Sequence, residues 1–119
     1  MAYIERKVDS LLEELLDSSG AVLIEGPKWC GKTTTAEQHA KSVIRLQNPD
    51  TREAYITTAK TKPSLLLKGE TPRLIDEWQI IAQLWDAVRA TVDERQEMGQ
   101  LILTGSNSVD NQQIMHSGT

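Results

Sequence analysis

The sequence predicts an α/β fold in which a parallel sheet carries helices on both faces. Short apolar segments at residues 21–25, 73–76 and 100–104 are typical of buried strands. Segments with apolar residues at helical spacing separate them, and a glycine-rich stretch directly follows the first strand. Because strands that alternate with helices are joined by right-handed crossovers, we expect the strands to run parallel.

The first expected element is an amphipathic helix that precedes the sheet. Its apolar residues recur at helical spacing: Ile4, Val8, Leu11, Leu12 and Leu15. Ser18-Ser19-Gly20 ends this helix, and residues 21–25 then form a strand that we expect to be fully buried, because it is apolar without alternation. A helix from Thr33 to about Lys41 and a short strand over residues 43–46 complete the first unit.

The second half of the chain continues the alternation of helices and strands. Asn48-Pro49-Asp50 marks a turn, and Asp50 is expected to cap the helix that follows. The later elements are, in order, a helix over 51–60, a turn over 64–68 that Pro63 opens and Gly69 ends, a strand over 73–76, a helix marked by Ile81, Leu84, Trp85, Val88 and Val92 that Gly99 terminates, and a strand over 100–104.

Length and composition indicate one domain with an aliphatic core. A chain of 119 residues is long enough for one compact domain and too short for two. Its residues are 39% hydrophobic and 25% charged, which is ordinary for a globular protein. The net charge of -4 argues against the large basic surface that non-specific nucleic-acid binding needs, and we interpret the basic stretch at 60–68 as a solvated face.

Cysteine usage indicates a reducing compartment. Cys30 has no second cysteine with which to form an internal disulfide, and the sequence shows no charged-then-apolar leader. No apolar run approaches the roughly 20 residues that a membrane-spanning helix needs. We therefore expect a cytoplasmic protein without membrane contact.

The most specific motif is Gly26-Pro27-Lys28-Trp29-Cys30-Gly31-Lys32-Thr33. It fits the pattern G-x-x-x-x-G-K-[ST] and lies where an expected strand ends and a helix begins. Its glycines allow the loop to wrap around an anion, consecutive backbone N–H groups point inward, and the helix start adds partial positive charge. The motif therefore predicts a phosphate-binding loop.

Three side chains of this stretch have expected chemical roles. Lys32 reaches the β- and γ-phosphates of a nucleotide as a point charge, and the Thr33 hydroxyl ligates a Mg²⁺ ion that bridges the same oxygens. Thr34 is a second candidate for phosphate contact. The residues expected to bind the nucleotide are Gly26, Pro27, Lys28, Trp29, Cys30, Gly31, Lys32, Thr33 and Thr34.

A second motif, Leu74-Ile75-Asp76-Glu77, supplies two carboxylates at the end of another expected strand. Nucleotide hydrolysis requires a carboxylate near Mg²⁺ and a base that orients water, both at the C-terminal edge of the sheet. We expect Asp76 to hold the metal through a water, and Glu77 to polarise the attacking water. The alternative is that the pair is only a polar strand end or a helix cap.

A third motif, Leu101-Ile102-Leu103-Thr104-Gly105-Ser106, is an apolar strand that ends in hydroxyl groups. If this strand lies between the strand before the phosphate loop and the strand before the acidic pair, Thr104 or Ser106 contacts the γ-phosphate or the attacking water. A simple turn at the strand end is the alternative for either residue.

Together GPKWCGKT, LIDEWQ and LTGS, in this order and spacing, resemble the AAA-type P-loop ATPases. The chain is most similar to a prokaryotic family of predicted ATPases that carries a C-terminal domain of unknown function. The resemblance implies a P-loop NTPase fold with strand order 5-1-4-3-2, and ATP and Mg²⁺ as cofactors. It also implies that Asp76 and Glu77 are the acidic pair and that Thr104-Gly105-Ser106 is the sensor segment.

The resemblance further implies that residues 1–119 are the N-terminal part of an AAA-type ATPase domain, truncated before the fifth strand. In the family, the segment that begins like His116-Ser117-Gly118-Thr119 continues to an arginine, the fifth strand and the second domain. Without the fifth strand, residues 21–25 form a sheet edge. We expect the leading helix, a partner chain or an exchanged segment to cover this edge, so that a homo-oligomer or a swapped dimer is one expected outcome.

The leading functional hypothesis is Mg²⁺-dependent ATP binding and hydrolysis to ADP, coupled to movement of the missing C-terminal domain. Because the family's arginine is also missing, we expect hydrolysis by this chain to be slow. One alternative is a nucleotide-responsive interaction module that switches assembly without significant hydrolysis. Another is a P-loop small-molecule kinase, although no arginine-rich lid follows the acidic pair. No Asn-Lys-x-Asp pattern that reads guanine occurs, and no residue pattern specifies adenine.

Overall fold

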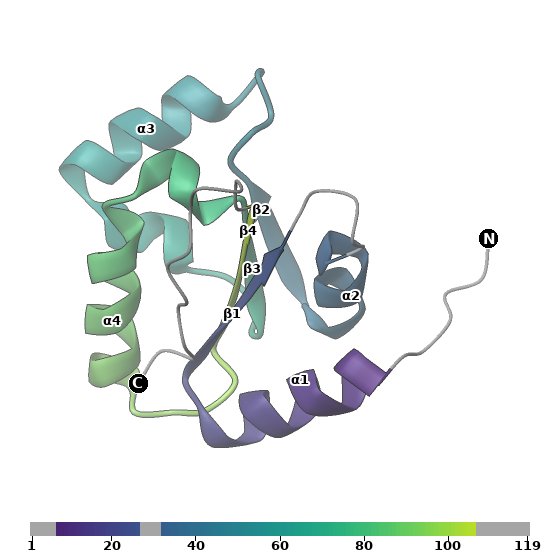
Figure 1. Cartoon of the computed structure of the whole chain (residues 1–119). Helices are drawn as coiled ribbons and strands as arrows, with labels where there is room; N and C mark the ends of the chain where they lie inside the picture. Colours follow the sequence, from purple (N-terminus) through teal and green to yellow (C-terminus); the bar gives the residue numbers. More distant parts are fainter. Residues whose placement is uncertain (1–6, 27–31, 107–119) are drawn as a thin grey trace.

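The computed structural model describes residues 7–26 and 32–106, which form three layers (Figure 1). The middle layer is a four-stranded sheet in the order β1-β4-β3-β2, and every pair of neighbouring strands is parallel. Its strands are β1 (Ala21–Gly26), β2 (Ser42–Arg45), β3 (Arg73–Asp76) and β4 (Leu101–Ser106). The predicted α/β fold class is confirmed, and the strand order agrees with the 1-4-3-2 part of the expected arrangement.

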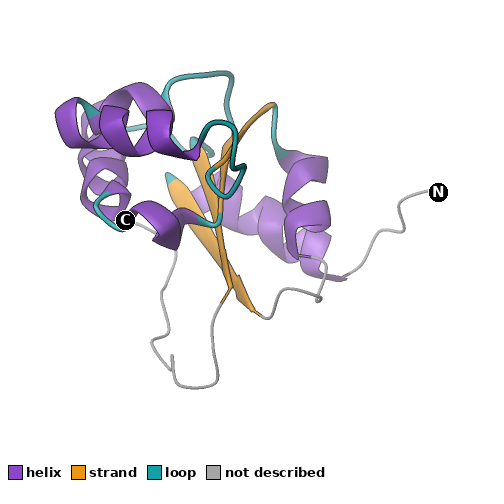
Figure 2. Ribbon diagram, turned by 90° about the horizontal axis from the view of Figure 1, so that it is seen from above, coloured by secondary structure: helices purple, strands orange, loops and turns teal. Residues whose placement is uncertain are grey.

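Helices cover both faces of this sheet (Figure 2). One face carries α1 (Lys7–Ser18) and α2 (Lys32–His39). The other carries α3 (Arg52–Thr61), α4 (Leu84–Arg95) and the 3₁₀ helices η2 (Pro63–Leu67) and η3 (Trp78–Ile81). No helix within these described ranges has both the length and the apolar character that a membrane span requires.

Each face of the sheet has its own hydrophobic core. Val22, Leu74 and Ile102 pack with α1 and α2, whereas Ile75 and Leu103 pack with the helices of the opposite face. Neighbouring residues of a strand point to opposite faces, so a strand covered on both sides is apolar at every position. This double burial explains why the central strands show no alternation in the sequence.

The leading helix is confirmed as α1, but the sequence did not identify which of its leucines face the sheet. Leu12 and Leu16 are buried, whereas Leu11 is 52% exposed. Residues four apart lie one above the other on a helix, so Leu12 and Leu16 form a single stripe against Val22 and Ile102. Leu11 lies away from that stripe, and its expected place in the apolar face was wrong.

The predicted start of α3 was wrong in one respect. Thr51, not Asp50, is the residue before the first helical turn, and it makes no side-chain capping hydrogen bond. The Asp50 N–H instead donates to Asn48 Oδ1 at 2.9 Å. An asparagine that accepts from the backbone two residues later forms a turn of its own, so this tight turn comes before the helix.

The predicted end of α4 at Gly99 was also wrong. The helix ends at Arg95, because Gln96 adopts a left-handed conformation with φ of 52° and donates its N–H to Val92 O. Gly99, with φ of 66°, instead shapes the turn into β4, where its N–H donates to Ser19 O at 2.9 Å. A positive φ of this size favours glycine.

Arg73, the first residue of β3, joins the sheet to η2. Its Nε donates to Leu66 O at 2.9 Å and its Nη1 donates to Ser42 Oγ at 3.2 Å. Burial disfavours the charged form and lowers the pKa of this guanidinium, although the charge of Tyr55 acts in the opposite direction. Arg73 therefore fixes the segment before β3 against the neighbouring strand β2.

β1 is the end strand of the sheet in the described part of the chain. It pairs with β4 along its whole length, from Ala21 opposite Leu101 to Gly26 opposite Ser106. Residues 23–25 are partly exposed, so the expectation of full burial was wrong for the second half of this strand. α1 packs against one face of β1. What covers the edge of β1 stays a prediction.

Candidate functional site

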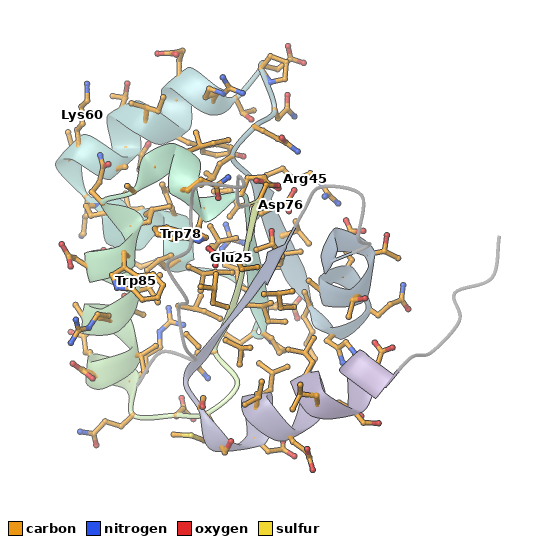
Figure 3. All side chains as sticks on the ribbon, in the orientation of Figure 1. Glu25, Arg45, Lys60, Asp76, Trp78 and Trp85 are labelled. Atoms are coloured by element: carbon orange, nitrogen blue, oxygen red, sulfur yellow. The ribbon has the colours of Figure 1, made fainter. Side chains whose placement is uncertain are left out.

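The three predicted motifs end at one edge of the sheet. Parallel strands bring their carboxyl ends together, which is where α/β proteins place ligands. Gly26, the last residue of β1, lies opposite Ser106, and Arg45 at the end of β2 lies opposite Asp76. Figure 3 shows Arg45 and Asp76 close together at this edge. The start of the predicted phosphate loop, at the end of β1, and the acidic pair, at the end of β3, therefore lie at the same edge of the sheet with only β4 between them.

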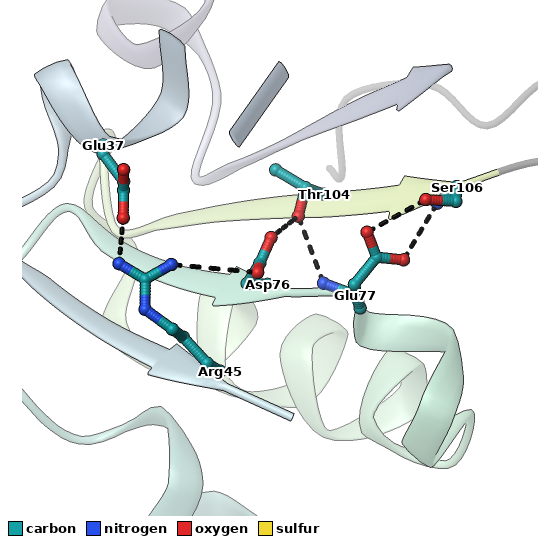
Figure 4. A network of polar contacts seen from close by, with 6 residues as sticks. All are labelled: Glu37, Arg45, Asp76, Glu77, Thr104 and Ser106. Carbon is teal, nitrogen blue, oxygen red and sulfur yellow. Dashed lines mark hydrogen bonds and ion pairs between the residues drawn. The ribbon is translucent and has the colours of Figure 1, made fainter. Parts of the chain in front are cut away.

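Asp76 and Thr104 form the buried centre of this edge (Figure 4). The side chain of Thr104 donates from Oγ1 to Asp76 Oδ1 at 2.6 Å and accepts from the Glu77 N–H at 3.1 Å. Thr104 is 0% exposed and Asp76 is 2% exposed. A hydroxyl that donates to a carboxylate and accepts from the next backbone amide fixes the end of β3 against β4.

Glu77 is turned toward the end of β4. Its backbone is left-handed, with φ of 60°, which is a strained conformation for a residue other than glycine. The Ser106 N–H donates to Glu77 Oε1 at 3.2 Å, and Ser106 Oγ donates to Oε2 at 3.0 Å. Gln79 Nε2 donates to Oε1 at 2.7 Å. The Glu77 carboxylate is thus held from β4 and from η3.

Arg45 links the acidic edge to the helix that follows the phosphate loop. Its Nη1 lies 3.9 Å from Asp76 Oδ2, and its Nη2 pairs with Glu37 Oε2 on α2. The Arg45 side chain is 47% exposed. Exposed ion pairs contribute about 0–1 kcal/mol, so this bridge affects local electrostatics more than stability.

The structure describes the predicted phosphate loop only at its two ends. Gly26 closes β1, and Lys32 and Thr33 begin α2. Residues 27–31 (Pro27, Lys28, Trp29, Cys30 and Gly31), and the side chains of Lys32 and Thr33, lie outside the described part of the structure. Thr34 is exposed on α2. The helix is anchored by Ala36, which is 0% exposed and packs against Val22, Leu74 and Ile102.

The oxygen donors of this edge suit a hard cation. Mg²⁺ is bound through one or two carboxylates together with phosphate oxygens and water, not by a cage of protein ligands. Asp76 supplies a carboxylate of this kind at the sheet edge. Across residues 7–26 and 32–106 no cluster of three or more His, Cys, Asp or Glu residues could hold a metal by itself. This donor set fits a metal that arrives with a nucleotide.

Three further residues have clear structural roles. Trp78 packs against Trp85 with ring centroids 5.1 Å apart and the ring planes tilted by 40°, and both side chains pack against the core (Figure 3). His39 on α2 contacts α1, because its Nε2 lies 2.8 Å from Oδ1 of the buried Asp9, and its side chain is 15% exposed. This contact joins α1 to α2. His116 lies outside the described residues.

Sequence reasoning assigned no site role to Arg45, Glu37 or Gln79. Arg45 is a charged residue at the end of a short strand, and this position is the one feature of the sequence that could have indicated a site role for it. Gln79 belongs to LIDEWQ, but nothing in its spacing indicates a contact with Glu77. Glu37 is one of several polar residues of a short helix.

Comparison with protein families finds a match over residues 18–118 to a family described as an AAA domain. The matched range contains all three motifs. No curated protein matches the chain.

Proposed function

The chain belongs to the AAA domain family, and from this premise we propose that it binds ATP with Mg²⁺ and hydrolyses it to ADP and phosphate. Membership by itself indicates a nucleotide-binding module of the AAA type. The observation that supports hydrolysis is the buried network of Asp76, Thr104, Glu77 and Ser106, at the sheet edge where β1 leads into the glycine-rich loop. A carboxylate beside a nucleotide's terminal phosphate is what hydrolysis requires.

In this proposal the loop binds the triphosphate. Backbone N–H groups between Gly26 and Gly31 would surround the phosphates, and Lys32 would contact the β- and γ-phosphate oxygens. Thr33 and Asp76 would hold Mg²⁺, and Thr34 would be an additional phosphate contact. When bound, the metal neutralises charge on the β- and γ-phosphate oxygens.

Glu77 acts on the attacking water. The water oxygen forms a bond to the γ-phosphorus while the bond from that phosphorus to the β,γ-bridging oxygen breaks, and ADP leaves with the bridging oxygen. The proton of the water passes to the Glu77 carboxylate. Thr104 holds Asp76, and Ser106 holds Glu77, through the hydrogen bonds described above. Direct contact of Thr104 or Ser106 with the γ-phosphate or the water stays a prediction.

Two alternatives use the same phosphate loop. In a nucleotide-responsive interaction module, binding alone switches assembly, and Glu77→Gln leaves the switch intact. In a small-molecule kinase, the γ-phosphate passes to an added acceptor in preference to water. Coupling of hydrolysis to a C-terminal domain, and assembly into a homo-oligomer or a swapped dimer, are further proposals that come from the family resemblance.

Equilibrium binding and turnover of Mg-ATP test the proposed function. We expect the wild-type chain to bind ATP more tightly with Mg²⁺ than without it, and to release phosphate. Lys32→Ala should abolish binding, whereas Lys68→Ala, which changes an exposed lysine outside the motifs, should leave it unchanged. Glu77→Gln should retain binding and lose turnover. ATP binding that is the same with and without Lys32 would refute the proposed site.

A further inference from the structure

Gln79 has no role in the function proposed above, yet its side chain contacts Glu77. Its Nε2 donates to Glu77 Oε1 at 2.7 Å, which is shorter than the hydrogen bonds from Ser106 at 3.0 Å and 3.2 Å. Hydrogen bonds to an ionised acceptor are stronger than those between neutral groups. Gln79 therefore holds one oxygen of the same carboxylate whose other oxygen Ser106 Oγ holds.

Gly105 leaves the space that this arrangement needs. A Cβ at position 105 would lie 3.1 Å from Gln79 Oε1 and 3.0 Å from Trp78 Nε1, so both side chains would have to move by a few tenths of an ångström. Among the described residues, the glycines with positive φ are Gly69 and Gly99, so Gly105 does not adopt a left-handed backbone conformation. The reason for a glycine here is therefore close approach of side chains, because its backbone conformation is open to any residue.

From these contacts we infer that Gln79, seated against Gly105, is a positioning residue that fixes the direction of the Glu77 carboxylate. The inference rests on the proposed function, in which Glu77 acts on the attacking water. A glutamate side chain has several rotatable bonds, so its carboxylate needs anchors to keep one orientation. Ser106 provides them from β4, and Gln79 provides another from η3. A displacement of about 1 Å at such a group can reduce a rate about 100-fold.

Single-turnover kinetics of Gln79→Met test this inference, because methionine has a similar length and no donor. We expect the rate constant of hydrolysis to fall about 10- to 100-fold while the dissociation constants for ATP and Mg²⁺ stay unchanged. Gln83→Met is the matched control, since Gln83 is exposed and makes no capping hydrogen bond at the start of α4. Gly105→Ala should lower the same rate constant, and the double variant should lose less than the two single losses combined.

Side-chain amide signals in NMR spectra provide a measurement that does not depend on turnover. The Gln79 Nε2 protons should exchange with water more slowly than those of Gln83, and their signals should shift in Glu77→Ala but not in Glu94→Ala, which changes an exposed glutamate of α4. If the wild-type chain does not hydrolyse ATP, the hydrolysis proposal fails, and this measurement alone decides the inferred contact. An unchanged hydrolysis rate in Gln79→Met would overturn the inference, and so would Gln79 side-chain signals that do not shift in Glu77→Ala.

Discussion

Removal of the Thr104 hydroxyl should destabilise the whole domain while leaving its shape intact. Thr104→Val keeps the size of the side chain but removes the donor to Asp76 Oδ1 and the acceptor of the Glu77 N–H. A hydrogen bond to a charged group contributes about 1.5–3 kcal/mol, and one between neutral groups about 1 kcal/mol. Since Thr104 is 0% exposed, water cannot replace either contact without rearrangement. We expect a loss of roughly 2–4 kcal/mol in the free energy of unfolding.

Urea denaturation followed by circular dichroism measures this loss. With a slope of about 2 kcal/mol/M, the midpoint should fall by roughly 1–2 M while the slope stays the same. Thr104→Ser is the matched variant, because it keeps the hydroxyl and loses one methyl group, at a cost of about 1 kcal/mol. The valine variant should therefore be the less stable of the two. If valine proves as stable as serine or more stable, the hydroxyl network does not hold β3 to β4 as described.

Three further perturbations test other parts of the structure. Gly20→Ala should cost about 1–3 kcal/mol of unfolding free energy in the same assay, because its Cβ would lie 2.3 Å from Val92 Cγ1; equal midpoints would contradict this packing. Ile102→Ala, at a fully buried position in the central strand, should cost about 2–5 kcal/mol, and a loss below 1 kcal/mol would show that the site collapses around the cavity. Arg45→Gln should lower the Mg²⁺ concentration for half-maximal ATP binding by about two- to fivefold, because it removes a positive charge 3.9 Å from Asp76 Oδ2. This effect should shrink in high salt, and an unchanged Mg²⁺ concentration would show that Arg45 does not influence the proposed metal site.

The sequence by itself determined the fold class and the strand that ends at the acidic pair, and it predicts the phosphate loop after β1. These features are local: a short apolar run, a glycine spacing or two adjacent carboxylates can be recognised from neighbouring residues alone. The bounds of β3, Arg73–Asp76, agree with the prediction because Leu74 and Ile75 are apolar and turn residues precede the strand. The start of α3 and the end of α4 were predicted wrongly, since they depend on the backbone dihedrals of Thr51 and Gln96, which many sequences could adopt.

Only the tertiary structure decided what the site residues contact. Thr104 and Asp76 are 28 positions apart, and Ser106 and Glu77 are 29 apart, so the register of β3 against β4 and not sequence proximity brings them together. The same register directs the Thr104 hydroxyl to Asp76 and leaves room at Gly105 for Gln79. Periodicity shows which positions are apolar, but the direction of a polar side chain depends on the neighbouring strand, because its hydrogen-bond partner comes from there.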